Sequence, residues 1–348
     1  MGDLGDPVSV SKSAEEQAEE ALEKKRHQQT RREKDRIIKS LMSRIEELEF
    51  RNEWIAMLEG APPSKPAKVR KHKTQRGKTA ATFCALASDW HVEERVRPDL
   101  VGGKNDYRPE ISAERAEAYT RNVVKILGLN RRAWDIREMV QWLGGDFITG
   151  HLHLEAVQEN YLAPGEAGLL AFDYLRRHLD ALLQTDLERI IVVCNYGNHG
   201  RLPDKPQPSM GFSNLEWMLY RILERWYDPE DRLVFQIADG YETLTDLYGY
   251  TVRWHHGDEV KYRGGLGGIT VPFYGRTGRQ AQGGDLADLD VIGHHHSLQH
   301  PRKLIINGSL IGYNPYAASK GFPFERPVQG SFCVDENHRT NFWPIETS

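Results

Sequence analysis

The sequence predicts an α/β protein, because short apolar, β-rich runs alternate with segments of helical periodicity from residue 81 onward. Residues 82–87 and 190–194 are the clearest strand-like runs. A second observation is that polar residues able to bind a metal follow several of these runs. In open α/β sheets, active sites form where the strands end and the loops begin. The sequence therefore predicts a functional site at the ends of the strands.

The expected elements follow one another along the chain. They are a strand (81–87), a helix near 111–127, a strand (136–143), a helix near 166–184 and a strand (189–194). A capping box of Ser213 and Glu216 is expected to open a helix that runs to Trp226. Strands are then expected at 232–238, 248–255, 288–292, 302–306 and 329–334. The segment 260–284 is rich in glycine and is expected to be a loop.

The first 60 residues predict a helical, coiled-coil-like extension. Residues 14–59 contain neither proline nor glycine and are rich in charged helix formers. The second half carries an apolar 3-4 repeat with one asparagine in its seam: Ile38, Leu41, Ile45, Leu48, Asn52 and Ile55. Isoleucine at a, leucine at d and a single asparagine at a favour a parallel two-stranded coiled coil. The alternative is an amphipathic helix that packs on its own catalytic domain.

A basic linker is expected between this helix and the first strand. Gly60 and the pair Pro62-Pro63 end the helix. Residues 61–80 then contain seven Lys/Arg and no acidic residue, which is typical of a solvated tether and also suits a nucleic-acid contact. The predicted domains are therefore a charged helix (1–60), a basic linker (61–80) and a catalytic domain (81–348).

Composition narrows the setting in which the chain works. No run of about 18 apolar residues is present, so no membrane span is expected. The first residues are polar and acidic and lack the apolar core of a secretory signal. The cysteines Cys84, Cys194 and Cys333 lie far apart within apolar runs and are expected to be buried free thiols. Together these features predict a cytoplasmic protein.

Five short segments contain the residues best suited to bind metal ions. Each follows a strand-like run, and they are Asp89-Trp90-His91, Gly145-Asp146, Gly197-Asn198-His199, His256-Gly257 and Gly293-His294-His295-His296. Side chains two residues apart in an extended segment face the same way. Asp89 and His91 are therefore expected to reach one ion, and His294 and His296 are expected to lie on one side of their segment. Carboxylate, imidazole and amide oxygen without thiolate suit Mn²⁺, Fe or Zn²⁺ rather than a structural zinc site.

In type and order these segments resemble the motifs of the calcineurin-like metallophosphoesterases, which are D-x-H, G-D, G-N-H, H and G-H-x-H. The resemblance covers roughly residues 80–345. It implies a four-layer α/β/β/α sandwich with two stacked central sheets. It also implies phosphoester hydrolysis with two divalent metal ions, most naturally Mn²⁺, with Fe, Zn²⁺ or Mg²⁺ as alternatives.

The resemblance also assigns roles to individual residues. Metal one would be held by Asp89, His91, Asp146 and His296, and metal two by Asp146, Asn198, His256 and His294. Asp146 would thus bridge the two ions, and His199 would act on the substrate as a general acid or transition-state stabiliser. The family commonly has an acidic residue directly after this histidine, where this chain has Gly200, so the orientation of His199 is open. His255 competes with His256, but a histidine that directly precedes glycine matches the family.

Four arginines are candidates for contact with an anionic substrate. They are Arg201, Arg263, Arg276 and Arg279, the last three within the glycine-rich segment. Active-site loops often carry such cations. A plain surface loop is the alternative for all four.

The predicted function is hydrolysis of a phosphoester by direct attack of a hydroxide held between the two ions, without a covalent nucleophile. The basic front of the chain favours a nuclease or phosphodiesterase similar to the DNA-repair exonuclease branch, with DNA as substrate partner and a homodimer formed by the helix. One alternative is a phosphomonoesterase or nucleotide hydrolase that acts on small or protein substrates. The other is a non-catalytic nucleic-acid-binding protein.

The zipper hypothesis predicts that Ile45→Asp combined with Leu48→Asp dissociates a dimer. The two aspartates would place unpaired like charges at the centre of the seam. Sedimentation velocity should show a dimer for the unmodified chain and a monomer for the double variant. A monomeric unmodified chain would refute the zipper.

Overall fold

The computed structural model describes residues 33, 34, 36–38, 42, 67–75, 77–150, 160–203, 211–261, 268–284 and 286–348. The chain divides into two compact units, Met1–Pro62 and Pro63–Ser348. In the first unit the six described residues are all helical, in line with the expected helix. The zipper positions Leu41, Ile45, Leu48, Asn52 and Ile55 lie outside the described residues.

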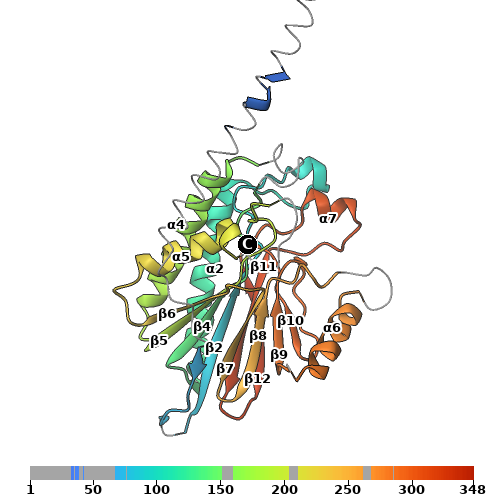
Figure 1. The fold of residues 1–348 in the computed structure, drawn as a ribbon. Helices are drawn as coiled ribbons and strands as arrows, with labels where there is room; N and C mark the ends of the chain where they lie inside the picture. The colour runs from blue at the N-terminus through green and yellow to red at the C-terminus, as the bar shows by residue number, and fades with distance from the viewer. Residues whose placement is uncertain are drawn as a thin grey trace, which may run out of the picture. The chain divides into compact units, whose positions relative to one another are not determined.

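The second unit contains a sheet of seven strands whose central members run parallel (Figure 1). Its order is β12 (Thr340–Glu346), β11 (Val328–Asp335), β2 (Thr79–Ala87), β4 (Glu138–Leu143), β5 (Arg189–Cys194) and β6 (Leu233–Ile237), with β3 (Trp134–Asp135) paired to β2. β2, β4, β5 and β6 are parallel, and β11 is antiparallel to both of its neighbours. The last residues of β2, β4 and β5 are in register, so their following loops leave the sheet side by side.

A second sheet has five strands. Its order is β1 (Lys68–Val69), β7 (Glu242–Leu247), β8 (Tyr250–His255), β9 (Leu289–Ile292) and β10 (Leu304–Ile306). β8, β9 and β10 are parallel, while β7 and β8 form an antiparallel pair. β9 and β10 are buried along their whole length, as expected of strands covered on both faces, whereas β7 carries polar and partly exposed residues.

The main core lies between the two sheets. It combines buried residues of both, including Leu86, Trp142 and Ile191 from the larger sheet and Val252, Trp254 and Val291 from the smaller one. The ring of Trp254 lies 6.1 Å from those of Trp142 and Phe332, measured between centroids. Two sheets packed through such a core make an α/β sandwich, in line with what the resemblance implies.

Helices cover the outer faces of the sandwich (Figure 1). α2 (Pro109–Asn130), α4 (Pro164–Leu183) and α5 (Leu215–Trp226) contact one another and the larger sheet. On the smaller sheet, α6 (Thr270–Gln282) buries Phe273 against Ile292, Leu304 and Ile306. Short helices η1 (Pro98–Val101), η2 (Gly211–Ser213) and α7 (Pro315–Ser319) belong to the loops. No described helix combines the length and apolar character that a membrane crossing requires.

The expected linker is part of the folded unit in its second half. Lys68 and Val69 form β1, which pairs in parallel with β7, and Val69 is buried. Further along, the backbone N–H of Gln75 donates to Asp135, and the ammonium of Lys78 donates to the carbonyl of Arg131. The prediction was wrong here because Ala67 and Val69 are the only buried residues among those described before β2, too few to show a periodic pattern.

The glycine-rich segment 260–284 was predicted as a loop, yet its second half is the helix α6. Gly275, Gly278 and Pro272 lower its intrinsic helix propensity. Packing of Phe273 and Ile269 on the smaller sheet outweighs this propensity, because most helical stability in proteins comes from tertiary contacts. The strands β7 and β12 were also not foreseen.

The start of α5 differs from the predicted capping box. Asn214, not Ser213, is the N-cap, and its side-chain oxygen accepts from the N–H of Glu216 at 2.8 Å. The carboxylate of Glu216 does not turn back to the cap and instead reaches the loops of the larger sheet. The helix begins close to where it was expected, but Glu216 has a different role.

Candidate metal centre

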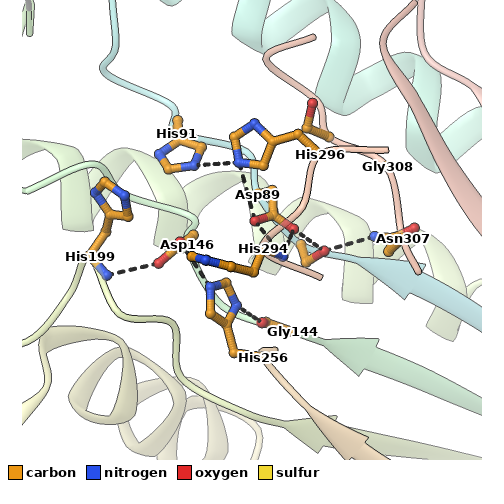
Figure 2. Close-up of polar contacts among 12 residues, drawn as sticks. Asp89, His91, Gly144, Asp146, His199, His256, His294, His296, Asn307 and Gly308 are labelled. Carbon is orange, nitrogen blue, oxygen red and sulfur yellow. Dashed lines mark hydrogen bonds and ion pairs between the residues drawn. The ribbon is translucent and has the colours of Figure 1, made fainter. Parts of the chain in front are cut away.

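The five predicted segments converge at one end of the sandwich (Figure 2). Asp89 follows β2, Asp146 follows β4 and Asn198 follows β5 in the larger sheet. From the smaller sheet, His256 follows β8 directly, and His294 and His296 follow β9. Backbone bonds continue the pairing beyond the strands, since Asp89 N donates to Gly145 O at 2.9 Å and Gly293 N donates to His256 O at 2.8 Å.

The side chains form two groups, each with ligand atoms that lie within 4.8 Å of one another: Asp89, His91 and His296, and Asp146, His256 and His294. In the first group, Nε2 of His296 lies 3.4 Å from Oδ1 of Asp89 and 3.3 Å from Nε2 of His91. In the second, Nε2 of His256 lies 2.9 Å from Oδ2 of Asp146. Asn198 joins the second group through Oδ1, which is 3.2 Å from the same Nε2.

Left-handed backbone, not strand alternation, aims these side chains. Positive φ occurs at Asp89 (57°), His91 (47°), Asp146 (53°), His294 (65°) and His296 (50°). The expectation that Asp89 and His91, or His294 and His296, extend a strand is therefore wrong. Each such conformation is costly for a residue with a side chain and persists only where the surroundings enforce it. His294 and His296 consequently reach different groups.

Glycines allow the two loops of the larger sheet to touch. A Cβ on Gly197 would lie 2.0 Å from Oδ1 of Asp146, and one on Gly145 would lie 2.2 Å from the backbone nitrogen of Gly197. Gly145 also has a φ of 88°, which favours glycine. The G-D and G-N-H segments thus need glycine because their backbones approach within van der Waals contact.

Glu216 connects these two loops through hydrogen bonds to their backbones. Its buried carboxylate accepts the backbone N–H groups of Asp146 (3.0 Å), Phe147 (2.6 Å) and Gly197 (2.7 Å), with Ile148 at 3.4 Å. A Cβ on Gly200 would lie only 2.9 Å from Cγ of Glu216. The side chains of Glu216 and Asn214, whose Oδ1 would lie 2.6 Å from the same Cβ, therefore fill the space beside Gly200.

Thr149 orients two histidines at once. Its hydroxyl lies 3.0 Å from Nδ1 of His91, and its carbonyl accepts from Nδ1 of His199 at 2.9 Å. Glu93 holds this turn by accepting the N–H groups of Thr149 and Gly150 at 2.7 and 2.9 Å. The open question of how His199 is oriented without a neighbouring acid is answered by a backbone carbonyl.

The charges at the centre act differently on its histidines: burial and neighbouring rings lower the pKa of His91 and His294, whereas His256 is paired with Asp146. Burial alone would lower the pKa of His256, but the Asp146 carboxylate outweighs it and raises that pKa well above its ordinary value. Burial alone would raise the pKa of Asp146, but His256 and His199 hold it well below its ordinary range. Asp146 and His256 thus stabilise each other's charged forms.

His255 lies in a separate ionic cluster. Its Nε2 is 2.9 Å from Nη1 of Arg276, and its Nδ1 is 3.1 Å from Oε1 of Glu259. Arg276 also contacts Glu242 at 2.8 Å, so its guanidinium is occupied by groups outside the centre. Neighbouring positions at the end of β8 face opposite ways, which places His256 at the centre and His255 away from it.

The remaining predicted arginines lie in different surroundings. Arg201 donates from Nη1 to the carbonyl of Asn198 at 2.9 Å and so lies beside the second group. Arg279 is exposed in the last turn of α6, and no described contact joins it to the centre. Arg263 lies outside the described residues.

Several residues that support the site were missed in the sequence. Thr149 lies three residues after Asp146, and Glu93 and Glu94 lie just beyond His91, so proximity to a motif was their only signal. Glu216 had no such signal, because it lies on a helix 70 residues beyond Asp146 along the chain.

Comparisons with known proteins do not assign the chain to a family. No family model and no curated protein matches it. Among solved structures, vacuolar protein sorting 29 from Cryptosporidium parvum is 13% identical, with a TM-score of 0.31, and the match covers 76% of this chain and 97% of that one. The hypothetical protein PH1004 from Pyrococcus horikoshii OT3 is 12% identical, with a TM-score of 0.37, over 76% and 88% of the two chains. Both values are too low to inform function, which is argued from the site itself.

Glu216→Gln should weaken divalent-ion binding by about 10–100-fold, the effect typical of lost supporting hydrogen bonds. The amide keeps the size of the side chain but replaces one acceptor oxygen by a donor that faces backbone N–H groups. Titration calorimetry with Mn²⁺ measures the affinity. Glu224→Gln on the same helix, whose carboxylate pairs with Arg221 at 3.0 Å, is the matched control. Equal affinities for both variants would show that Glu216 does not position the loops.

His256→Ala should reduce the Mn²⁺ bound per chain from about two to one, whereas His255→Ala should leave both ions bound. The geometry places only the first ring beside Asp146 and Asn198. Elemental analysis measures the bound metal of each variant. Its circular dichroism spectrum is first compared with that of the unmodified chain, to show that the variant is folded. Metal loss in His255→Ala alone would move the ligand by one position.

Proposed function

We propose that the chain is a phosphoester hydrolase that uses two divalent metal ions, most naturally Mn²⁺, and that its substrate is a phosphodiester of nucleic acid. The observation that carries the proposal is the pair of ligand groups, Asp89–His91–His296 and Asp146–His256–His294, formed side by side by loops from both sheets. Such a pair suits a dinuclear hydrolase, and a single structural ion would not need it.

The donor atoms of the second group fit a metal ion. Nδ1 of His256 donates to the carbonyl of Gly144 at 2.8 Å, so in the neutral ring Nε2 presents a lone pair. That lone pair faces a carboxylate oxygen of Asp146 and the amide oxygen of Asn198. A proton on Nε2 or a divalent ion can lie between these atoms, and in this proposal the ion takes the place and would displace the proton. The Asp89 group repeats the arrangement with two imidazoles and one carboxylate.

In this proposal Asp146 is the ligand shared by both ions. Its Oδ2 faces His256, and its Oδ1 accepts the backbone N–H of His199 at 2.9 Å. Two divalent ions, when bound, would hold the non-bridging oxygens of a phosphate and activate the attacking water. The residues of the chain would orient the phosphate and transfer a proton to the leaving oxygen.

His199 is the proposed catalytic residue. The bond from Nδ1 to Thr149 O assigns the ring proton to Nδ1 in the neutral form, so Nε2 is the basic nitrogen. The ring lies 5.0 Å from that of His91, between centroids and nearly perpendicular, which places it at the first group. A histidine so placed suits protonation of the leaving oxygen or stabilisation of charge on the phosphate.

Support for a nucleic-acid substrate comes from the basic residues that precede the site. Residues 61–80 carry seven Lys/Arg, and their described part packs beside the starts of β4 and β5, at the end of the larger sheet opposite the metal centre, where it would contact a nucleic acid that extends beyond the site. A homodimer through the N-terminal helix would double these contacts. Arg201, beside Asn198, is the proposed phosphate contact nearest the centre.

Asp146→Asn should abolish hydrolysis of bis(4-nitrophenyl) phosphate in Mn²⁺, because a neutral amide cannot hold two cations. Bound metal should fall from about two ions per chain.

His199→Ala should lower kcat by about 10²–10⁴-fold while both ions remain bound. The exposed His300→Ala is the control and should keep the full rate.

Two outcomes would contradict this function. Full turnover and two bound ions in Asp146→Asn would remove the shared-ligand assignment. Hydrolysis of 4-nitrophenyl phosphate at a much higher rate than the diester, with no cleavage of DNA or RNA, would favour a phosphomonoesterase.

A further inference from the structure

Exposed aromatic side chains gather around the turn that follows His91. We call the set the aromatic rim: it consists of the exposed Tyr161, Tyr316, Phe322 and Phe324 and the partly buried Tyr313. The exposed fractions are 43% for Tyr161, 61% for Tyr316 and 46% for Phe324, which is unusual for large apolar groups so close together. None of these side chains has a role in the proposed metal centre.

Hydrogen bonds connect the rim to the metal centre. Tyr161 N donates to the carbonyl of Glu93 at 2.8 Å. Asn314, directly before α7, donates to Oε1 of Glu94 at 3.0 Å, and Oε2 of Glu94 lies 3.9 Å from Nδ1 of His91. Beyond Phe324, Glu325 accepts the N–H of Leu298, two residues after His296. The rim thus borders the Asp89–His91–His296 group.

Four of the rings pack edge to face in two pairs, so no two of them cover each other by parallel stacking. Tyr316 and Phe322 have centroids 6.2 Å apart with planes at 80°, and Tyr313 and Phe324 lie 5.8 Å apart at 67°. An edge covers only one face of its partner ring. Tyr316 and Phe324 remain 61% and 46% exposed, so a large part of each side chain stays accessible to a ligand.

A cation accompanies three of the rings. Arg95 lies over Tyr161 at 5.4 Å, Lys104 over Tyr313 at 5.1 Å and Lys320 over Tyr316 at 5.6 Å. Within the described part of the chain, none of these three cations has a carboxylate at ion-pair distance. Their charge is therefore available to an anion that approaches the rings.

We propose that the aromatic rim stacks the unpaired bases of a single-stranded nucleic acid while Arg95, Lys104 and Lys320 contact its phosphates. Aromatic faces with interleaved cations are the two parts of single-strand binding surfaces. A duplex keeps its bases stacked on one another and cannot offer their faces, so the rim selects single strands. The inference rests on the proposed function, because it supplies the strand whose phosphate reaches the metal centre.

The test measures binding of a fluorescent oligodeoxythymidine and of a matched duplex by anisotropy, with the full chain and EDTA present so that no cleavage occurs. Tyr316→Ala combined with Phe324→Ala should weaken single-strand binding by at least about tenfold and leave duplex binding unchanged. Tyr316→Trp in the otherwise unmodified chain should keep or strengthen single-strand binding, because a flat aromatic ring is kept for stacking. Trp226→Ala is the matched control, since Trp226 is 59% exposed and has Arg176 over its ring at 6.0 Å, far from this turn in the sequence.

Hydrolysis of bis(4-nitrophenyl) phosphate separates the two proposals. This small diester has no bases in a strand, so the rim variants should cleave it at the unmodified rate. Absence of its hydrolysis by the unmodified chain would count against the proposed function, while the binding assay would still test the rim. Unchanged single-strand affinity in the double alanine variant would overturn the proposal that the rim binds single strands. A protein-binding surface would then be the alternative role of the rim. An equal loss for single strand and duplex would overturn base stacking.

Discussion

The buried carboxylate of Glu216 binds the backbone of two separate loops, and the candidate site depends on this contact. Three short hydrogen bonds from Asp146, Phe147 and Gly197 converge on it. An unsatisfied buried N–H costs about 1–3 kcal/mol, so loss of this acceptor would destabilise both loops together. The same loops present Asp146, Asn198 and His199, which makes a residue without chemistry of its own decisive for the geometry of the others.

The backbone around the ligands is held against its own preference. Five residues of the centre adopt left-handed φ, and each costs on the order of 1 kcal/mol or more. Together this is a sizeable part of the roughly 5–15 kcal/mol by which a folded domain is stable. Bonds such as His91 N to Asp146 O at 3.1 Å, and the contact of Gly145 with Gly197, offset the cost. Strain concentrated at one place in the fold is what a pre-organised binding site requires.

The sequence allowed a correct prediction of the α/β class and of the residues that meet at the centre, because strands and ligand motifs are local patterns. The reason those residues meet was predicted wrongly: Asp89 and His91 leave the strand in left-handed turns instead of extending it. Long-range contacts escaped the sequence altogether. Glu216 looked like half of a capping box, α6 like a loop, and Val69 like part of a tether, because only packing against distant strands gives each its role.

Anomalous diffraction from crystals grown with Mn²⁺ tests the central claim most directly. The account predicts two anomalous peaks roughly 3.5–4 Å apart, one beside Asp89, His91 and His296 and the other beside Asp146, His256 and His294, with Asp146 between them. A single peak, or peaks that avoid Asp146, would contradict the dinuclear centre on which the proposed hydrolysis rests.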